Sequence, residues 1–355
     1  MPIEHVPLAR HCTMGVGGPA RYFFEARDEG AVREALDWAA RQRVALYVLG
    51  GGSNLVVADS GVDGLVLKIA LRGLVAREAG RAVELTAAAG EPWDDLVRLT
   101  VERGWAGLEC LSGIPGLVGA TPIQNVGAYG QEVSEALTHV RALDRRSGQV
   151  VKLSPDECGF TYRDSLFKRG EPGRYVVLAV GYRLVPGGKA AVRYRDVEQD
   201  LERRGVRAPS LAEVRESVLG IRRSKSMVLD EDDPNRRSCG SFFLNPIVTG
   251  AELQRIEERA RVEPAMPSWP MPDGRVKLSA AWLIQAVGFE RGQREGPVGL
   301  SSRHTLAIVC HDGARAVDVL TFARRLRARV EERFGVRLHP EPVFWGPLDL
   351  DGGNS

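Results

Sequence analysis

The stretch GLECLSGIPGLVGATPIQNVGAYGQEV, residues 107–133, decides how the rest of the chain is interpreted. It contains six glycines, only two carboxylates and no lysine, arginine or histidine. Glycine costs about 1 kcal/mol in a helix interior and also weakens a strand, so the run fits neither element. It is too apolar for a solvated linker. We therefore expect a buried loop whose backbone lies tightly against a partner that satisfies its N–H groups.

Two kinds of partner fit this loop. Small residues and bare amides suit a pyrophosphate and a flat ring, whereas the alternative is a tight internal cluster of turns. A second glycine-rich loop, LGGGSNLVVAD at residues 49–59, favours the ligand. The chain has no GxGxxG motif after a strand and no GxxxxGK[ST] motif, so a nucleotide cofactor here would use neither a Rossmann fold nor a P-loop.

The amino-acid composition is typical of a soluble globular enzyme. A length of 355 residues predicts two or three domains, and 44% hydrophobic and 26% charged residues are typical of a globular protein. A net charge of +2 provides no basic footprint for nucleic acid or an anionic membrane. The sequence has no apolar run of about 20 residues, and its start does not resemble a signal peptide. We expect a cytoplasmic protein without membrane insertion and see no sign of an obligate protein partner.

The cysteines and histidines show no ligand spacing. Five scattered cysteines predict free thiols in a reducing compartment, and six histidines form no HExxH or HxH cluster, so we predict no metal site.

Strand and helix signals alternate along the first half of the chain, which predicts an α/β or α+β unit. Strands are expected at residues 22–24, 46–49, 65–69, 83–87, 140–143, 150–153 and 176–185. Helices are expected after Asp28, Pro92, Ser210 and Thr249, and at residues 277–287 and 314–334. The charged segment 230–237 and the arginines of the last helix (Arg324, Arg325, Arg327 and Arg329) are expected to be solvated, and the tail 349–355 to be loose.

Three short segments carry side chains suited to chemistry. Arg163, in FTYRDS, is either a structural ion pair with Asp164 or a carboxylate clamp, since guanidinium offers a bidentate fork. Ser241, in CGSFFLNP, is either part of a turn into a strand or an exposed hydroxyl in dry surroundings. Glu341, in HPEPVFWG, is either a polar edge-strand residue or a rigidly held carboxyl whose burial would raise its pKa. Tyr194 and Lys225 are weaker candidates and could be surface residues.

Taken together, these motifs resemble one family. The order GGGSN, GLECLSGIPGxVGATPxQNVGAYGxEV, GFxYRxSxFK, CGSFFxNP, KLSAAWLI and PEPV is similar to that of the UDP-N-acetylenolpyruvoylglucosamine reductases, over residues 10–346. The segment around Tyr194 and residues 187–209 resemble the longer class of this family.

The resemblance implies an α+β fold with a two-subdomain FAD-binding part of the vanillyl-alcohol-oxidase type and a third, α+β substrate-binding domain. The implied boundaries are 1–71 and 72–208 for the FAD-binding subdomains, 209–346 for the substrate-binding domain and 347–355 for the tail. It also implies non-covalent FAD, NADPH as co-substrate and UDP-N-acetylglucosamine enolpyruvate as the molecule reduced, in peptidoglycan precursor synthesis.

Roles carried over by position divide the site into three sets. Arg163 would clamp the enolpyruvyl carboxylate, Glu341 would assist it, and Ser241 would protonate the substrate carbon. Tyr194, Lys225 and Asn245 would hold the UDP portion. The FAD-binding residues would be Gly50, Gly51, Gly52, Ser53, Asn54, Leu55, Ser112, Gly113, Ile114, Pro115, Gly116, Gly119, Ala120, Thr121, Gln124, Asn125, Gly127, Ala128, Tyr129, Gly130 and Val133.

Two other functions remain open from the sequence. One is an oxidase of the same flavin fold that uses oxygen, and the other is a non-catalytic nucleotide-sugar binder. Neither glycine loop contains a histidine, which argues against covalent flavin attachment there. Cys239 and Pro342, next to Ser241 and Glu341, have no assigned role, and Pro342 would stiffen its strand.

Overall fold

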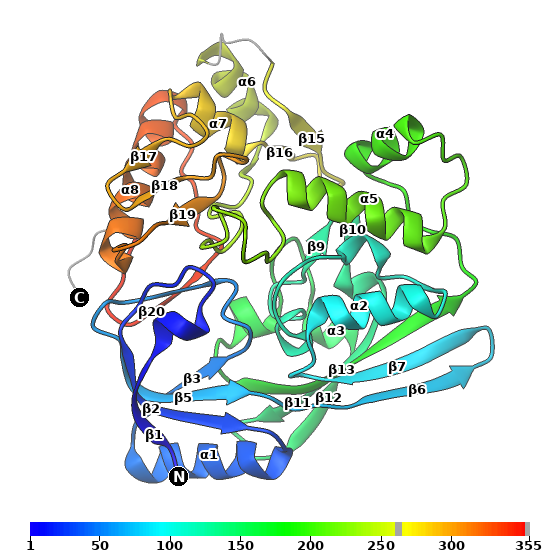
Figure 1. The fold of residues 1–355 in the computed structure, drawn as a ribbon, viewed down its shortest axis with the longest axis vertical. Coiled ribbons are helices and arrows are strands. Elements are labelled where there is room, and N and C mark those ends of the chain that lie inside the picture. The colour runs from blue at the N-terminus through cyan, green and yellow to red at the C-terminus, as the bar shows by residue number, and fades with distance from the viewer. Residues whose placement is uncertain (260–264, 352–355) are drawn as a thin grey trace. The chain divides into compact units, whose positions relative to one another are not determined.

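The computed structural model describes residues 1–259 and 265–351, which form two compact units interleaved along the chain. Unit 1 contains residues 1–5, 21–51 and 63–229; unit 2 contains residues 6–20, 52–62 and 230–355. Helices and strands are mixed in both, as Figure 1 shows. Within the described ranges, no helix is long and apolar enough to cross a membrane.

Unit 1 is built on two sheets. The first has the strand order β1-β2-β5-β3, formed by β1 (Ile3–Pro7), β2 (Pro19–Ala26), β5 (Val62–Ile69) and β3 (Ala45–Leu49). Helix α1 (Glu29–Gln42) lies along this sheet in Figure 1 and buries Val32, Ala35 and Ala39 in the same core as Leu65 and Leu67. The Asp28 side chain accepts a hydrogen bond from Ala31 N and caps α1, as predicted from the sequence.

The second sheet of unit 1 is antiparallel, with the order β12-β11-β13-β7-β6 and β8 paired to β13. Its centre is the long strand β13 (Tyr175–Pro186), which lies between β11 (Leu137–Asp144) and β7 (Ala82–Ala88). The outer strands are β12 (Val150–Leu153), β6 (Leu74–Ala79) and β8 (Trp105–Ala106). The predicted hairpin around residues 144–149 is confirmed by the β11–β12 pairing.

Helices complete unit 1. They are α2 (Trp93–Glu102), α3 (Pro155–Cys158), α4 (Arg195–Arg203) and α5 (Leu211–Ser224), and residues 166–170 form one π-helical turn. Ser210 and Glu213 form the predicted capping box of α5. We expected the third domain to start near residue 209, yet α5 belongs to unit 1, where it packs with α4 and Cys110 around Val214 and Val218. The predicted domain boundaries stay predictions.

Unit 2 has its own core around the long helix α8 (Ala316–Phe334). Its strands are β4 (Leu55–Val57), β14 (Ile247–Val248), β15 (Ser268–Pro270), β16 (Val276–Leu278), β17 (Arg294–Glu295), β18 (Val298–Leu300), β19 (Ile308–Cys310) and β20 (Val343–Trp345). Its other helices are the short 3-10 turn Leu8–His11, α6 (Gly250–Arg259) and α7 (Ala280–Ala286). β20 runs parallel to β4, which joins two segments nearly 290 residues apart.

One local expectation in unit 2 is wrong. Residues 277–287 are not one helix: Lys277 and Leu278 belong to β16, and α7 begins only after Ser279, which caps it. In the polar segment 230–237, by contrast, the charged residues are exposed or half-buried, while the uncharged Asn235 is buried and hydrogen-bonds Ser302.

The last helix and the tail also differ from expectation. Arg327 is 9% exposed and pairs with Asp351 at 2.6 Å, so the arginines of α8 are not all solvated. The described part of the tail is held in place, because Leu350 is buried and Asp351 also pairs with Arg337. Residues 352–355 of the predicted loose tail lie outside the described part of the chain.

Candidate active site

The glycine-rich stretch 107–133 folds as predicted, without a long helix or strand. It contains the 3-10 turns Glu109–Leu111 and Val118–Ala120 and the two-residue strands β9 (Gly127–Ala128) and β10 (Gln131–Glu132), and a further 3-10 turn begins at Val133. Much of its backbone is satisfied internally. Gly113 N donates to Asp94 Oδ1 at 2.5 Å, and Gly119 N donates to the carbonyl oxygen of Ala89 at 2.9 Å. For these amides the tight turn cluster is the better description.

The two glycine loops meet inside unit 1. A Cβ added to Gly51 would lie 2.8 Å from the Cα of Gly116, so the two backbones lie close together and Gly51 has no room for a side chain. Among the described residues, no acceptor meets the N–H groups of Gly51 and Gly116. Converging bare amides suit a pyrophosphate, so these residues fit the phosphate part of a dinucleotide cofactor.

Arg163 lies in a tight turn. Thr161 and Asp164 exchange backbone hydrogen bonds across it (3.0 and 3.2 Å), and Arg163 has φ +54°, which is uncommon for a residue with a side chain. Its Nη2 donates to the carbonyl oxygen of Gly127 at 2.5 Å, and Asn125 binds the carbonyl oxygen of Thr161. The central loop therefore fixes the turn that carries Arg163. Asp164 forms an ion pair with Arg169 at 3.2 Å, which weakens the purely structural interpretation of Arg163.

Ser241 and Glu341 are brought onto adjacent strands of unit 2. Phe243 and Pro340 are bridge partners in an antiparallel pairing, flanked by hydrogen bonds from Glu341 N to Phe242 O and from Leu244 N to His339 O, both 2.9 Å. Pro340 occupies a position that needs no backbone donor, so its missing N–H costs nothing. Continued by one residue, this register places the backbone of Ser241 opposite Pro342, next to that of Glu341.

The backbone of Glu341 is held from both sides. Besides its bond to Phe242, its carbonyl oxygen accepts a hydrogen bond from Asn54 Nδ2 at 3.1 Å, and Val343 N donates to Asn54 O at 3.0 Å. Pro342 is therefore placed where the chain passes from one strand partner to the next, which accounts for the stiff residue noted in the sequence. The segment that carries Ser241 is closely packed. Phe242 and Phe243 are buried, and their rings lie edge to face with the centroids 5.2 Å apart.

The three predicted UDP-binding residues have different surroundings. Tyr194 is the residue directly before α4, and its ring lies edge to face with that of Tyr129, with the ring centroids 5.4 Å apart. Burial raises the pKa of its hydroxyl. Lys225 ends α5, and its Nζ pairs with Asp196 at 2.9 Å, so its amine reaches the first turn of α4, next to Tyr194. Asn245, in unit 2, uses its Oδ1 to accept from Ala280 N and so helps to cap α7, which leaves its amide nitrogen as the donor for a ligand.

Sequence reasoning missed Arg222 in the last turn of α5. Its Nε is enclosed and has no hydrogen-bond partner in the described structure, and burial lowers the pKa of the guanidinium. The spacing of apolar residues in α5 could have indicated it. Val214 and Val218 are buried four residues apart, and the next position of this stripe is residue 222. An arginine in this stripe is unusual, and it is half-buried in the structure.

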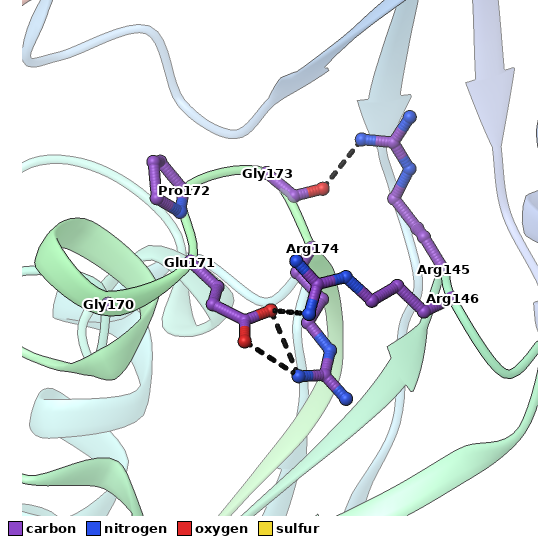
Figure 2. Close-up of a pocket in the computed structure, with 7 residues that line it drawn as sticks. All are labelled: Arg145, Arg146, Gly170, Glu171, Pro172, Gly173 and Arg174. Atoms are coloured by element: carbon purple, nitrogen blue, oxygen red, sulfur yellow. Dashed lines mark hydrogen bonds and ion pairs between the residues drawn. The ribbon is translucent and has the colours of Figure 1, made fainter.

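A second arginine cluster lines a cavity of about 510 Å³ in unit 1 (Figure 2). Figure 2 shows Arg146 and Arg174 turned towards Glu171, at 2.8 and 2.9 Å, and Arg145 bonded to the carbonyl oxygen of Gly173. Arg174 also binds Asp144 through two nitrogens (2.9 and 2.7 Å), which holds the pKa of that carboxyl well below its usual range. These charges are compensated within the protein, and none of the predicted site residues lines this cavity.

Comparisons with known proteins agree with this geometry. Residues 232–345 match the model of the C-terminal domain of UDP-N-acetylenolpyruvoylglucosamine reductase, and residues 20–154 match an FAD binding domain. The chain is 49% identical over 346 residues to UDP-N-acetylenolpyruvoylglucosamine reductase of Saccharopolyspora erythraea (95% of this chain, 94% of the relative). It is 48% identical over 353 residues to the protein of that name from Streptomyces coelicolor (97% and 90%).

A solved structure extends the likeness to the fold. The crystal structure of UDP-N-acetylenolpyruvylglucosamine reductase from Thermus caldophilus superposes with a TM-score of 0.63 at 28% identity, covering 98% of this chain and all of that one. The predicted α+β FAD-binding fold is thereby confirmed. At such identity over nearly the whole length, the chain belongs to the UDP-N-acetylenolpyruvoylglucosamine reductase family, and it is an FAD-containing oxidoreductase.

Proposed function

We propose that the protein reduces UDP-N-acetylglucosamine enolpyruvate to UDP-N-acetylmuramate with NADPH, in the cytoplasm, as a step of peptidoglycan precursor synthesis. The observation that carries this proposal is the antiparallel pairing around Phe243 and Pro340, because it brings the backbone segments that carry Ser241 and Glu341 next to each other. The names of the relatives from Saccharopolyspora erythraea and Streptomyces coelicolor support the same substrate.

The glycine loops would hold the cofactor. The N–H groups of Gly51 and Gly116 would donate to the pyrophosphate, and the wider sets 50–55 and 112–133 would enclose the rest of FAD. Bound FAD would supply the redox chemistry, taking a hydride from NADPH and passing one to the enol ether.

The protein's own side chains would manage charge and the proton. Hydride addition to the far carbon of the double bond places negative charge on the neighbouring carbon and its carboxylate. Arg163 would bind this carboxylate with its guanidinium fork, and Glu341, sharing a proton with the carboxylate, would assist. Ser241 would then give its hydroxyl proton to the carbanionic carbon. A serine hydroxyl is a weak acid, and it can serve because the acceptor carbon is very basic.

The test separates this proposal from the oxidase and from the binding protein. Purified holoprotein is mixed anaerobically with NADPH and the flavin absorbance near 450 nm is followed; bleaching is expected, and NADH serves as the comparison. UDP-N-acetylglucosamine enolpyruvate is then added without oxygen and should restore the absorbance. Reoxidation by oxygen alone, with no response to the enol ether, would indicate an oxidase. A protein that NADPH does not bleach would contradict the reductase proposal.

A further inference from the structure

Lys68 lies near the end of a strand that is otherwise largely buried. Its neighbours in β5, Leu67 and Ile69, are buried, whereas Lys68 is half-buried. Lysine is seldom found in such a strand unless its ammonium group has a polar partner. Here the Nζ donates a hydrogen bond to the carbonyl oxygen of Gly50 at 2.7 Å. The ammonium group is therefore tied to the backbone of the first glycine-rich loop.

This hydrogen bond is made at the edge of the sheet where a ligand is expected. β3 and β5 lie side by side and run parallel (Figure 1), and Leu49, the last residue of β3, is paired with Lys68. In open sheets with parallel strands, ligands bind at the carboxyl ends of the strands, where the loops leave the sheet. Gly50 and Gly51 are the first loop residues after β3, so Lys68 supplies a positive charge at this edge.

The carbonyl oxygen of Gly50 and the N–H of Gly51 belong to the same peptide unit. A trans peptide is planar, and its carbonyl oxygen and its N–H point in opposite directions. Because Lys68 holds the carbonyl oxygen, it also fixes the direction of the Gly51 N–H, which points away from the ammonium group. That N–H meets no acceptor among the described residues. A cation on the carbonyl oxygen makes it a stronger donor, since linked hydrogen bonds polarise one another.

We propose that Lys68 is a positioning residue for FAD, which orients and polarises the Gly50–Gly51 peptide so that the Gly51 N–H donates to the pyrophosphate of the cofactor. This inference rests on the proposed function, because it takes the glycine loops as the place of the pyrophosphate. A donor that is already fixed needs less ordering when the anion binds, and hydrogen bonds to a charged phosphate are the stronger kind. Lys68 should therefore contribute to the affinity for FAD and little to the stability of the flavin-free protein.

The test measures FAD binding and the stability of the flavin-free protein separately. Lys68→Met keeps an unbranched side chain but removes its charge and its donor. It should raise the Kd of FAD, followed by flavin fluorescence, about tenfold and leave the urea midpoint of the flavin-free protein near that of wild type. Lys68→Arg keeps a cationic donor and should restore most of the affinity.

Arg33→Met is the matched control. Arg33 in α1 also donates to a glycine carbonyl oxygen, that of Gly148 at 2.8 Å, but Gly148 belongs to neither glycine-rich loop. The Kd of FAD for this variant should stay within about twofold of wild type.

Two results would overturn the inference. An unchanged Kd of FAD in Lys68→Met would mean that the hydrogen bond to Gly50 does not serve the cofactor. A lower urea midpoint, with a loss of FAD binding that Lys68→Arg does not restore, would make Lys68 structural. If Lys68→Met does not fold, Lys68→Gln is measured in the same way.

Gly51→Ala separates this inference from the proposal on which it rests. Weakened FAD binding by Gly51→Ala together with normal binding by Lys68→Met would refute only the role of Lys68. Normal binding by both variants would place the pyrophosphate elsewhere and refute the proposed cofactor site. The proposed reduction of the enol ether is tested independently, by the anaerobic mixing of wild-type holoprotein with NADPH and the enol ether.

Discussion

Removing the hydroxyl of Ser241 should affect one half-reaction of the proposed reaction and not the other. Its hydroxyl is needed only when the enol ether is reduced, whereas oxidation of NADPH requires no proton from it. Ser241→Ala should therefore keep flavin reduction by NADPH near the wild-type rate and slow reoxidation by the enol ether by several orders of magnitude. The loss of one hydroxyl from a half-buried position should cost about 1 kcal/mol of stability at most.

Stopped-flow absorbance of each half-reaction checks this prediction. Ser238→Ala is the matched control: it removes a hydroxyl from the same loop, and that hydroxyl accepts a long hydrogen bond of 3.4 Å from Gly240 N. Equal slowing of both half-reactions in Ser241→Ala would mean that Ser241 shapes the flavin pocket. Unimpaired reoxidation would move the proton donor to Glu341 or to a water.

Substitutions of Arg163 can show whether its charge alone or the fork geometry of its guanidinium supports kcat. A guanidinium that binds developing charge through two nitrogens should contribute about 10²-fold or more to kcat. Arg163→Ala should lose this factor, and Arg163→Lys should also be impaired because lysine keeps the charge but not the fork. Steady-state kcat and KM are measured for both variants. Arg169→Gln in the same loop should stay close to wild type, because Arg169 is 63% exposed and pairs with Asp164 at the surface. An Arg163→Ala enzyme of normal rate would make the turn purely structural.

At the scale of elements, the ion pair between Asp94 on α2 and Arg215 on α5 ties the two helices together. Burial raises the pKa of Asp94, but the hydrogen bonds from Arg215 and Gly113 N outweigh it, so the pKa lies below its ordinary value. Folding thus lowers the pKa of this carboxyl. Its stabilisation is fully present above about pH 4, the range in which the unfolded carboxyl titrates, and is lost as the pH falls through the folded pKa.

Asp94→Asn should consequently be less stable than wild type at pH 7, and the difference in unfolding free energy should shrink as the pH approaches 3. Urea unfolding followed by circular dichroism over this pH range measures it. Asp95→Asn, one residue along α2 with a side chain 63% exposed and a 3.5 Å contact to Arg98, should change stability little at any pH. A constant difference between Asp94→Asn and wild type down to pH 3 would show that the carboxylate charge is not what joins the helices.

At the scale of the whole molecule, much of the secondary structure followed from local chemistry. The cap at Asp28, the capping box at Ser210 and Glu213 and the β11–β12 hairpin depend on residues close in sequence, and all were predicted. The residues 277–287 were misassigned, because the strand part of this apolar run is decided by its pairing with β14 and β15, which only the tertiary structure provides.

Site residues that belong to a recognisable sequence motif could be predicted. Residues whose position depends on tertiary packing could not. Ser241 and Glu341 stood out as isolated polar groups in apolar company, yet their strand pairing spans about 100 residues, and no local pattern announces it. Arg222 was overlooked because its neighbours in sequence are ordinary surface residues of a helix end. Its electrostatic neighbours Asp94, Tyr129 and Arg163 lie 59 to 128 residues away along the chain.

The contact between the two glycine loops leads to a prediction for the stability of the molecule with and without its cofactor. A methyl group on Gly51 would lie 2.8 Å from the Cα of Gly116, and backbone on both sides leaves little room to yield. Gly51→Ala should cost about 1–3 kcal/mol in the flavin-free protein. If the amides of Gly51 and Gly116 hold the pyrophosphate, the extra stability that FAD provides should fall as well, since this increment grows with affinity and is about 2.7 kcal/mol at 100 times Kd.

Thermal or urea unfolding of each protein, stripped of FAD and then titrated with it, measures both effects. Gly220→Ala is the matched control, because Gly220 is exposed within α5 and an added Cβ would meet nothing within 4 Å. That variant should gain about 0.5–1 kcal/mol from improved helix propensity and keep the wild-type response to FAD. A Gly51→Ala protein that is destabilised but gains as much from FAD as wild type would show that the loops meet for packing alone, and would place the pyrophosphate elsewhere.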